Sequence, residues 1–260
     1  MSRWNISRRF MRVWERNLRV YRRTWAISFI PPVLEPVLYL LAFGVGLSAL
    51  VGEVHYRGSR LSYVTFIAPS LLSINIMYNS FFENTYASFV RMYYQKTFDA
   101  MLATPLSLEE VITGEIVWGA TKSVLATVLM LCVVSLFGLI HYPHGLLILP
   151  LALLGGIAFG SMGMLFTSFV PHIEMFNLPI FLLISPMFLF SGTFFPLEVL
   201  PQWVRPLAWA LPLTHLVEAS RSLALGRLEM ELFWHLLYLS LLSSILFPLA
   251  ISRMRARLIK

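Results

Sequence analysis

The chain has 260 residues, of which 58% are hydrophobic, with a mean hydropathy of +0.73 and a formal net charge of +7. This composition leaves too few polar residues to cover a soluble globule, so we expect an integral membrane protein with a single domain over residues 1–260. The only cysteine, Cys132, lies inside an apolar run, which excludes a disulfide framework and a cysteine-ligated zinc site.

Residues 1–25 have the spacing of an amphipathic helix, because Phe10, Val13 and Tyr21 recur at helical intervals. Arginines follow the same period on the other face: Arg9, Arg12, Arg16, Arg19 and Arg23. We expect this helix to lie on the cytoplasmic leaflet. A solvated basic face is a second interpretation. A mitochondrial transit peptide is a third, which the lack of a cleavage-type break before the next apolar run disfavours.

Six apolar runs follow, each close to the ~20 residues that a membrane-spanning helix needs. They cover residues 27–50, 63–86, 116–140, 146–170, 176–195 and 233–251. The sequence therefore predicts an all-α membrane protein with six transmembrane helices and both termini on one side.

The distribution of lysine and arginine predicts the orientation. Eight of these residues stand in the N-terminal segment, two in the loop after the second run and four in the tail, against five on the opposite side. The positive-inside rule then places both termini in the cytoplasm. The basic excess indicates topology and attraction to anionic lipid, and not nucleic-acid binding.

A few polar residues interrupt the first two runs. Asn75, Asn79 and Glu83 recur every four residues, so they should form one polar stripe on the second helix. Such a stripe is unsuited to lipid tails. It either lines a polar path through the bundle or hydrogen-bonds neighbouring helices, and the second role is commoner. Glu35, near the start of the first run, is a similar candidate.

The loop over residues 89–113 predicts two short helices that meet at a sharp corner. One apolar face of the first helix would be made by Phe98, Met101 and Leu102. Thr104 and Pro105 should end that helix, because a proline disfavours helical geometry at the preceding residue. Ser107 and Glu110 have capping-box spacing and should start the next helix. From spacing alone, a turn resting on the bilayer surface is slightly favoured over a docking site.

The region 196–227 is moderately apolar but interrupted by prolines, so we expect short helices that dip into the outer leaflet. Trp203, Trp209 and His215 suit an interfacial depth, where a ring is half buried and its polar atom is wet. For His215 an interface anchor is the favoured interpretation over a specific ligand contact. No metal site and no catalytic constellation is predicted, because the histidines of the chain lack carboxylates at ligand spacing.

Three stretches together resemble a known family. They read EPVLYLLAFGVGL, FDAMLATPLSLEEVITGEIVWGATKS and SPMFLFSGTFFPLEVLPQWVRPLAWALPLTHLVEASRSLALG. The chain is similar, over most of its length after residue 30, to the permease subunits of type-2 ABC exporters. Within these it most resembles the nodulation lipooligosaccharide-export permeases of the NodJ kind.

The resemblance implies a permease of the bacterial inner membrane that forms a homodimer and pairs with cytoplasmic ABC ATPase subunits. Its cargo would be an amphiphile or a saccharide-bearing lipid moved out of the cytoplasm. A coupling helix would fall on residues 98–104, with these ATPase-coupling residues: Phe98, Asp99, Met101, Leu102, Thr104 and Pro105. The N-terminal helix would be a second ATPase contact, and residues 196–227 would line the outer exit as a re-entrant region. Asp at both Phe98 and Met101 is then expected to prevent assembly without unfolding the permease.

We expect ATP and Mg²⁺ to bind the partner ATPase and no cofactor to bind this chain. Gly114 and Gly119 have phosphate-loop spacing, but Lys122 stands two positions too late and the stretch is an apolar helix without a preceding strand. Lys122 should instead snorkel to the cytoplasmic interface. The alternative function is a secondary transporter driven by an ion gradient. It would require repeated halves and a midplane carboxylate, but no repeat is visible and Glu35 lies near a span end.

Overall fold

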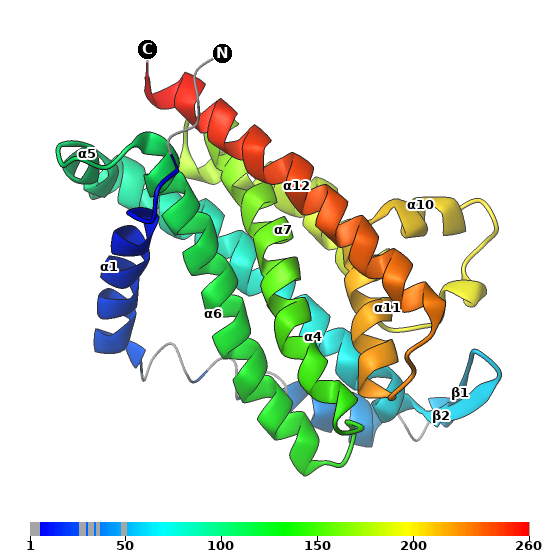
Figure 1. The fold of residues 1–260 in the computed structure, drawn as a ribbon. Helices are drawn as coiled ribbons and strands as arrows, with labels where there is room; N and C mark the ends of the chain where they lie inside the picture. The colour runs from blue at the N-terminus through cyan, green and yellow to red at the C-terminus, as the bar shows by residue number, and fades with distance from the viewer. Residues whose placement is uncertain (1–5, 26–29, 31–33, 35–36, 48–50, 260) are drawn as a thin grey trace.

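The computed structural model describes residues 6–25, 30, 34, 37–47 and 51–259. Helices that run side by side make up most of this part of the chain (Figure 1). Five of them are long and apolar enough to cross a membrane: Tyr63–Tyr94, Leu108–Leu136, His144–Phe169, Ile173–Phe190 and Met230–Leu258. The prediction of a helical membrane protein is confirmed at this level. The first apolar run lies partly outside the described residues, so the count of six spans stays a prediction.

The elements before the second span are a helix and a hairpin. Helix α1 covers Phe10–Arg23, residues 37–41 are helical and continue into η1 (Ala42–Leu47), and the strands are β1 (Glu53–Tyr56) and β2 (Ser59–Ser62). The short hairpin was not predicted, and it is a small addition to a mostly helical chain. Its two-residue loop places Arg57 and Gly58 at φ +47° and +74°, which is the backbone geometry that two-residue hairpin turns favour.

The second span is longer than predicted. It consists of α4 (Tyr63–Phe82) and two π-helical segments, η2 (Glu83–Ala87) and η3 (Val90–Tyr94). The helix therefore continues past the expected boundary at residue 86, and the predicted loop 89–113 shrinks to a connection that contains α5 (Thr97–Leu102). A charge at Arg91 suggested a loop, but carboxylates of the same bundle neutralise it inside the helix.

The remaining elements form the other spans and the outer region. Their bounds are α6 (Leu108–Leu136), η4 (His144–Leu147), α7 (Ile148–Phe169), η5 (Ile173–Phe176), α8 (Asn177–Pro179), η6 (Ile180–Ile184), α9 (Ser185–Phe190), η7 (Leu197–Val199), α10 (Arg205–Ala210), α11 (Pro212–Ala224) and α12 (Met230–Leu258). The expected short helices within 196–227 are thus η7, α10 and α11, and their depth in a leaflet stays a prediction.

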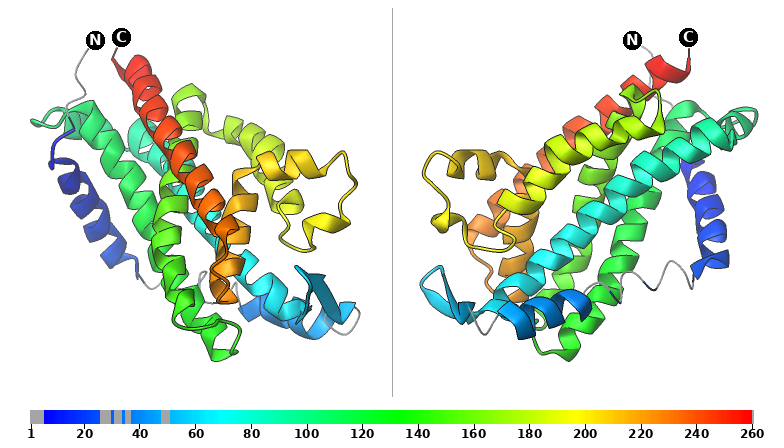
Figure 2. Two further views of the ribbon diagram at one scale, coloured as in Figure 1. Left: turned by 45° about the vertical axis from the view of Figure 1, so that its right-hand side comes forward. Right: turned by 180° about the vertical axis from the view of Figure 1, so that it is seen from behind.

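Helix α7 lies between α4, α6 and α12 (Figures 1 and 2). Small residues allow this close approach, since a Cβ built on Gly156 would lie 2.8 Å from Ala120 Cα of α6. Two clusters of buried apolar residues fill the bundle. The larger one surrounds α4, α7 and α11, and the smaller one joins α5 to the η3 end of the second span and to the neighbouring ends of α6 and α12.

The first turn of α6 contacts both ends of the described chain. Ser7 donates a backbone hydrogen bond to Glu110 Oε1 at 3.2 Å, and Arg255 Nη1 bonds Glu109 Oε1 at 3.0 Å. The two ends therefore lie on one side of the bundle, beside α5, and the hairpin lies toward the opposite side (Figure 1). This agrees with the expectation that both termini share a side. Which side is cytoplasmic stays a prediction.

Candidate functional site

The corner between α5 and α6 forms as its local sequence predicts. Lys96 has a left-handed backbone with φ +54°, which lets the chain leave the long second span and begin α5. Ser107 Oγ accepts the Glu110 N–H at 3.2 Å, and Glu110 Oε2 accepts the Ser107 N–H at 2.9 Å. This reciprocal pair is the predicted capping box, and it fixes where α6 starts.

The apolar face of α5 points into the protein. Phe98 is fully buried, while Met101 and Leu102 are partly buried against the same cluster, which also contains Phe89 and Met254. The three residues therefore share a face as predicted, but that face supports the corner from inside. Asp at position 98 would place a charge in the core and destabilise the fold, so it cannot test docking alone. Asp99, Thr104 and Pro105 form part of the exposed side.

Helix α1 is confirmed and packs lengthwise along the first part of α6 (Figure 2). A Cβ on Gly114 would lie 2.5 Å from Val13 Cβ, so glycine is what allows the two helices to touch. Trp14 Nε1 also donates to Thr121 Oγ1 at 2.9 Å. The apolar face of α1 is thus used on α6, and its contact with a leaflet stays a prediction.

The arginines of α1 do not all share one environment. Four of the five predicted residues are exposed: Arg9, Arg12, Arg19 and Arg23. Arg9 Nη1 donates to the Pro105 carbonyl at 2.8 Å, which ties the start of α1 to the corner. Arg16 is half-buried and turned inward, and burial lowers its pKa from the ordinary value, although the nearby Glu115 carboxylate opposes this shift.

The predicted polar stripe divides into two parts. Asn79 Nδ2 donates to Asn75 O at 3.0 Å and to Asn75 Oδ1 at 3.2 Å, so these two residues bond within their own helix. Glu83 is buried and bonds across to α6 instead. The fourth candidate, Glu35, lies outside the described residues.

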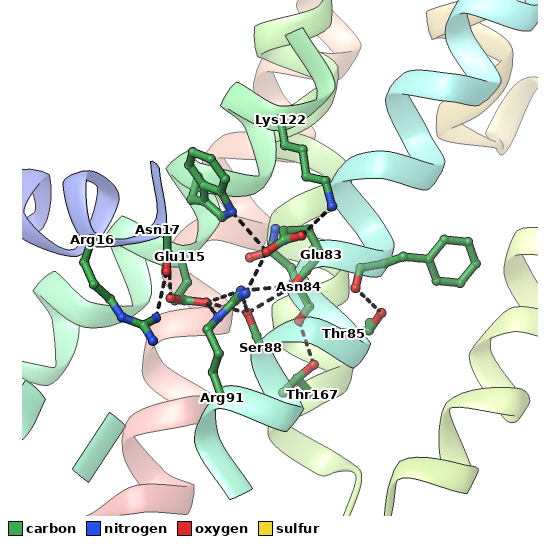
Figure 3. A network of polar contacts seen from close by, with 12 residues as sticks. Arg16, Asn17, Glu83, Asn84, Thr85, Ser88, Arg91, Glu115, Lys122 and Thr167 are labelled. Atoms are coloured by element: carbon green, nitrogen blue, oxygen red, sulfur yellow. Dashed lines mark hydrogen bonds and ion pairs between the residues drawn. The ribbon is translucent and has the colours of Figure 1, made fainter. Parts of the chain in front are cut away.

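Glu83 belongs to a group of four charged residues that we call the polar cluster: Glu83, Arg91, Glu115 and Lys122 (Figure 3). Arg91 lies between the two carboxylates, with its Nη1 2.8 Å from Glu83 Oε1 and its Nη2 2.6 Å from Glu115 Oε2. Lys122 Nζ is 2.9 Å from Glu83 Oε2. Both carboxylates are buried, and each buried charge has a partner, as a low-dielectric interior requires.

The polar cluster changes the interpretation of Lys122, which pairs with Glu83 and so has a partner inside the bundle. Sequence reasoning did not connect these residues and did not select Arg91 or Glu115. A signal was present, because charges inside apolar spans require partners in the same bundle. The contacts between the second span and α6 join positions 24 to 39 residues apart, so this pairing could not be read from helical spacing.

A cavity of about 530 Å³ opens beside the polar cluster. The charged residues of its lining are Arg16, Glu83, Arg91 and Lys122. Its walls come from α1, from the end of the second span, from α6 and from Ile173 of η5.

The outer region holds the predicted aromatic residues. Trp203 is 75% exposed and Trp209 is 40% exposed, whereas His215 lies against the Tyr238 ring with 3.8 Å between ring centroids. His215 Nε2 lies 2.9 Å from the Trp209 carbonyl, and its Nδ1 lies 3.0 Å from His235 Nδ1. Burial lowers the pKa of His215 from its ordinary value of 6.5, and its role as an interface anchor stays a prediction.

A second buried ion pair holds the hairpin to α11. Arg221 is fully buried, with Nη1 2.6 Å from Glu218 Oε1 and Nη2 2.6 Å from Ser70 Oγ. The hairpin adds Tyr56 Oη at 2.6 Å and Arg57 Nη2 at 3.0 Å to Glu218 Oε2. In the sequence analysis Arg221 was only one of the five basic residues counted on the side opposite the termini, and its pairing with Glu218 was not predicted.

Comparison with known proteins gives matches over most of the chain. The model of the ABC-2 type transporter family matches residues 8–225. Nodulation protein J of Rhizobium leguminosarum bv. viciae is 32% identical over 251 residues, which are 96% of this chain and 95% of that protein. Nodulation protein J of Rhizobium leguminosarum bv. trifolii is 33% identical over 254 residues, covering 98% and 95%. The inner membrane transport permease YadH of Escherichia coli strain K12 is 24% identical over 215 residues, 82% of each chain.

Proposed function

Because the chain belongs to the ABC-2 type transporter family, we propose that it is the permease subunit of an ATP-driven exporter whose ATP is hydrolysed by a separate cytoplasmic subunit. The cargo is an amphiphilic or saccharide-bearing lipid leaving the cytoplasm. The protein works as a homodimer in the bacterial inner membrane, with both termini in the cytoplasm.

The absence of a phosphate-binding loop at residues 114–123 supports a separate ATPase. That stretch lies inside α6, where backbone N–H groups are used by the helix and Gly114 serves contact with Val13. A phosphate loop needs free backbone amides at a strand-to-helix turn.

The partner ATPase in this proposal docks on the corner between α5 and α6. The observation that supports this docking surface is the attachment of the corner to the bundle. Its inner face packs on the η3 end of the second span and on the ends of α6 and α12 through the smaller apolar cluster, and Arg9 joins it to α1. Its outer face presents Asp99, Ala100 and Ala103 to solvent. A partner that pushes on this outer face would therefore displace three membrane helices together, which is the mechanical coupling that an external motor requires.

A second cavity, at the hairpin side of the bundle, supports an amphiphilic cargo. It has a volume of about 560 Å³ and lies between the hairpin and residues 194–199. Val54, Tyr63 and Phe194 give it apolar walls, and Glu53 and His55 supply polar groups. Such a mixed lining suits a molecule with an acyl part and a polar head.

Co-purification of the permease with its ATPase tests the docking surface. Asp99→Arg combined with Ala100→Arg changes only exposed positions of α5, and we expect it to reduce the recovered ATPase at least about tenfold, because each Arg must be desolvated against a surface shaped for other residues. Glu53→Arg in the hairpin, at the other side of the bundle, is the matched control and should leave recovery unchanged. Equal recovery for the α5 variant and wild type would refute docking at this corner.

A further inference from the structure

The cavity beside the polar cluster contains more positive than negative charge. Arg16, Arg91 and Lys122 face it or lie at its wall, whereas the carboxylates of the polar cluster are only Glu83 and Glu115. Among the residues that the structure describes, one positive charge in this part of the bundle is therefore left without a carboxylate. Partly desolvated charges without counter-charges are costly, and an anionic ligand removes that cost.

Unused hydrogen-bond donors belong to the same residues that carry the excess charge. Arg16 has five N–H groups, of which one donates to Asn17 Oδ1 at 2.9 Å. Lys122 has three, of which one donates to Glu83 Oε2. Within the described part of the chain, no other acceptor bonds these two cationic groups. Arg91, in contrast, bonds Glu83, Glu115 and Ser88 through all three nitrogens of its guanidinium group.

Most of the remaining lining is apolar or aromatic, beside the uncharged polar residues Asn17, Thr24 and Gln95. Val20, Tyr21, Tyr86, Val90, Trp118 and Ile173 surround the charged groups. An inorganic anion would use only the cationic donors, whereas a molecule with a charged head and an apolar body would use both parts of the wall. The cavity also lies against helices that span the membrane, so lipid molecules are its natural neighbours.

We propose that this cavity binds the anionic head group of an amphiphile, with Arg16 and Lys122 donating to a phosphate or carboxylate and the aromatic wall contacting the chain beside it. The site stands apart from the proposed transport function, because it concerns binding of a lipid by the permease alone. Arg12, on the exposed face of α1, takes no part in it.

The test is a native mass spectrometry titration of the purified full-length permease. The probes are palmitoyl-oleoyl-phosphatidylglycerol, which carries a net negative charge, and the neutral palmitoyl-oleoyl-phosphatidylcholine. We expect tighter binding of the first lipid and a loss of about tenfold or more in its affinity for Arg16→Gln, since a charge-assisted hydrogen bond is removed. Arg16→Lys should retain most of the affinity because it keeps the charge.

Matched variants separate this site from general surface attraction. Arg12→Gln removes the same charge from the same helix at a position whose side chain is 76% exposed, and it should bind as wild type does. Ala87→Trp narrows the cavity without changing charge and should also weaken binding, which keeps the proposal testable if Arg16→Gln folds poorly. Equal affinity for the two lipids, or an equal loss for the Arg12 and Arg16 variants, would overturn the proposal. Displacement of phosphatidylglycerol by 10 mM inorganic phosphate would overturn its amphiphile part and leave a simple anion site.

Discussion

Replacing Glu115 by Ala tests whether the polar cluster holds together the half of the bundle that carries both ends of the described chain. Glu115 is fully buried and accepts from Asn17 Nδ2 at 2.8 Å, Ser88 Oγ at 2.7 Å, and Arg91 Nε and Nη2 at 2.8 and 2.6 Å. One carboxylate of α6 therefore joins α1, η3 and Ser88, which follows η2. Its removal takes an acceptor away from four donor atoms of three residues in the protein interior.

The expected cost follows from the burial of Arg91, whose side chain is 14% exposed. Removing one partner of a buried ion pair costs about 3–5 kcal/mol, because the remaining charge is left uncompensated. Arg91 keeps Glu83 as a partner, so we expect the lower end, about 3 kcal/mol. For a chain of this size, that loss should lower the midpoint of thermal unfolding by roughly 6–12 °C.

The measurement is thermal unfolding in detergent, followed by tryptophan fluorescence. Glu53→Ala is the control, since Glu53 is 62% exposed and 3.9 Å from Arg60, and surface substitutions usually change stability by less than about 0.5 kcal/mol. In an Arg91→Met background the effect of Glu115→Ala should shrink, because its two strongest bonds are already gone. A change of about 1 kcal/mol in stability shifts the unfolding midpoint by about 2 °C. If the midpoint of Glu115→Ala lies within that range of wild type, the conclusion that the polar cluster stabilises the fold is wrong.

Three further predictions concern other contacts. Gly114→Ala should loosen α1, because overpacking against Val13 costs about 1–3 kcal/mol, and tryptic cleavage in α1 should become faster. Gly46→Ala is the control, since no atom lies within 4 Å of its new Cβ, and it should not change the cleavage rate. Arg221→Met should destabilise the chain by about 3–5 kcal/mol, because Glu218 stays buried without its main partner, and an unchanged melting curve would contradict this. Lowering the pH through 6.5 should reduce stability. The pKa of His215 is lowered in the folded protein, so the unfolded chain binds more protons in that pH range. The unfolding midpoint of His215→Gln should therefore depend less on pH.

Several features could be predicted from the sequence because they depend on residues close together in the chain. Apolar runs of about 20 residues identify membrane spans, and helical spacing identifies α1. The capping box at Ser107 and Glu110 marks the start of α6 within one turn. The family resemblance depends on such local stretches as well, and the comparisons confirm it.

The tertiary structure decided the properties that depend on distant residues. Helical spacing places Phe98 and Met101 on one face of α5, but only the packing of η3, α6 and α12 determines that this face is buried. Likewise, Arg91 looks like the start of a loop until Glu83 and Glu115 neutralise it, which lets the second span continue to Tyr94. Periodicity reports which face of a helix is apolar. Contacts between distant segments of the chain determine which element covers that face and which charges pair. The local sequence around each residue does not indicate these contacts.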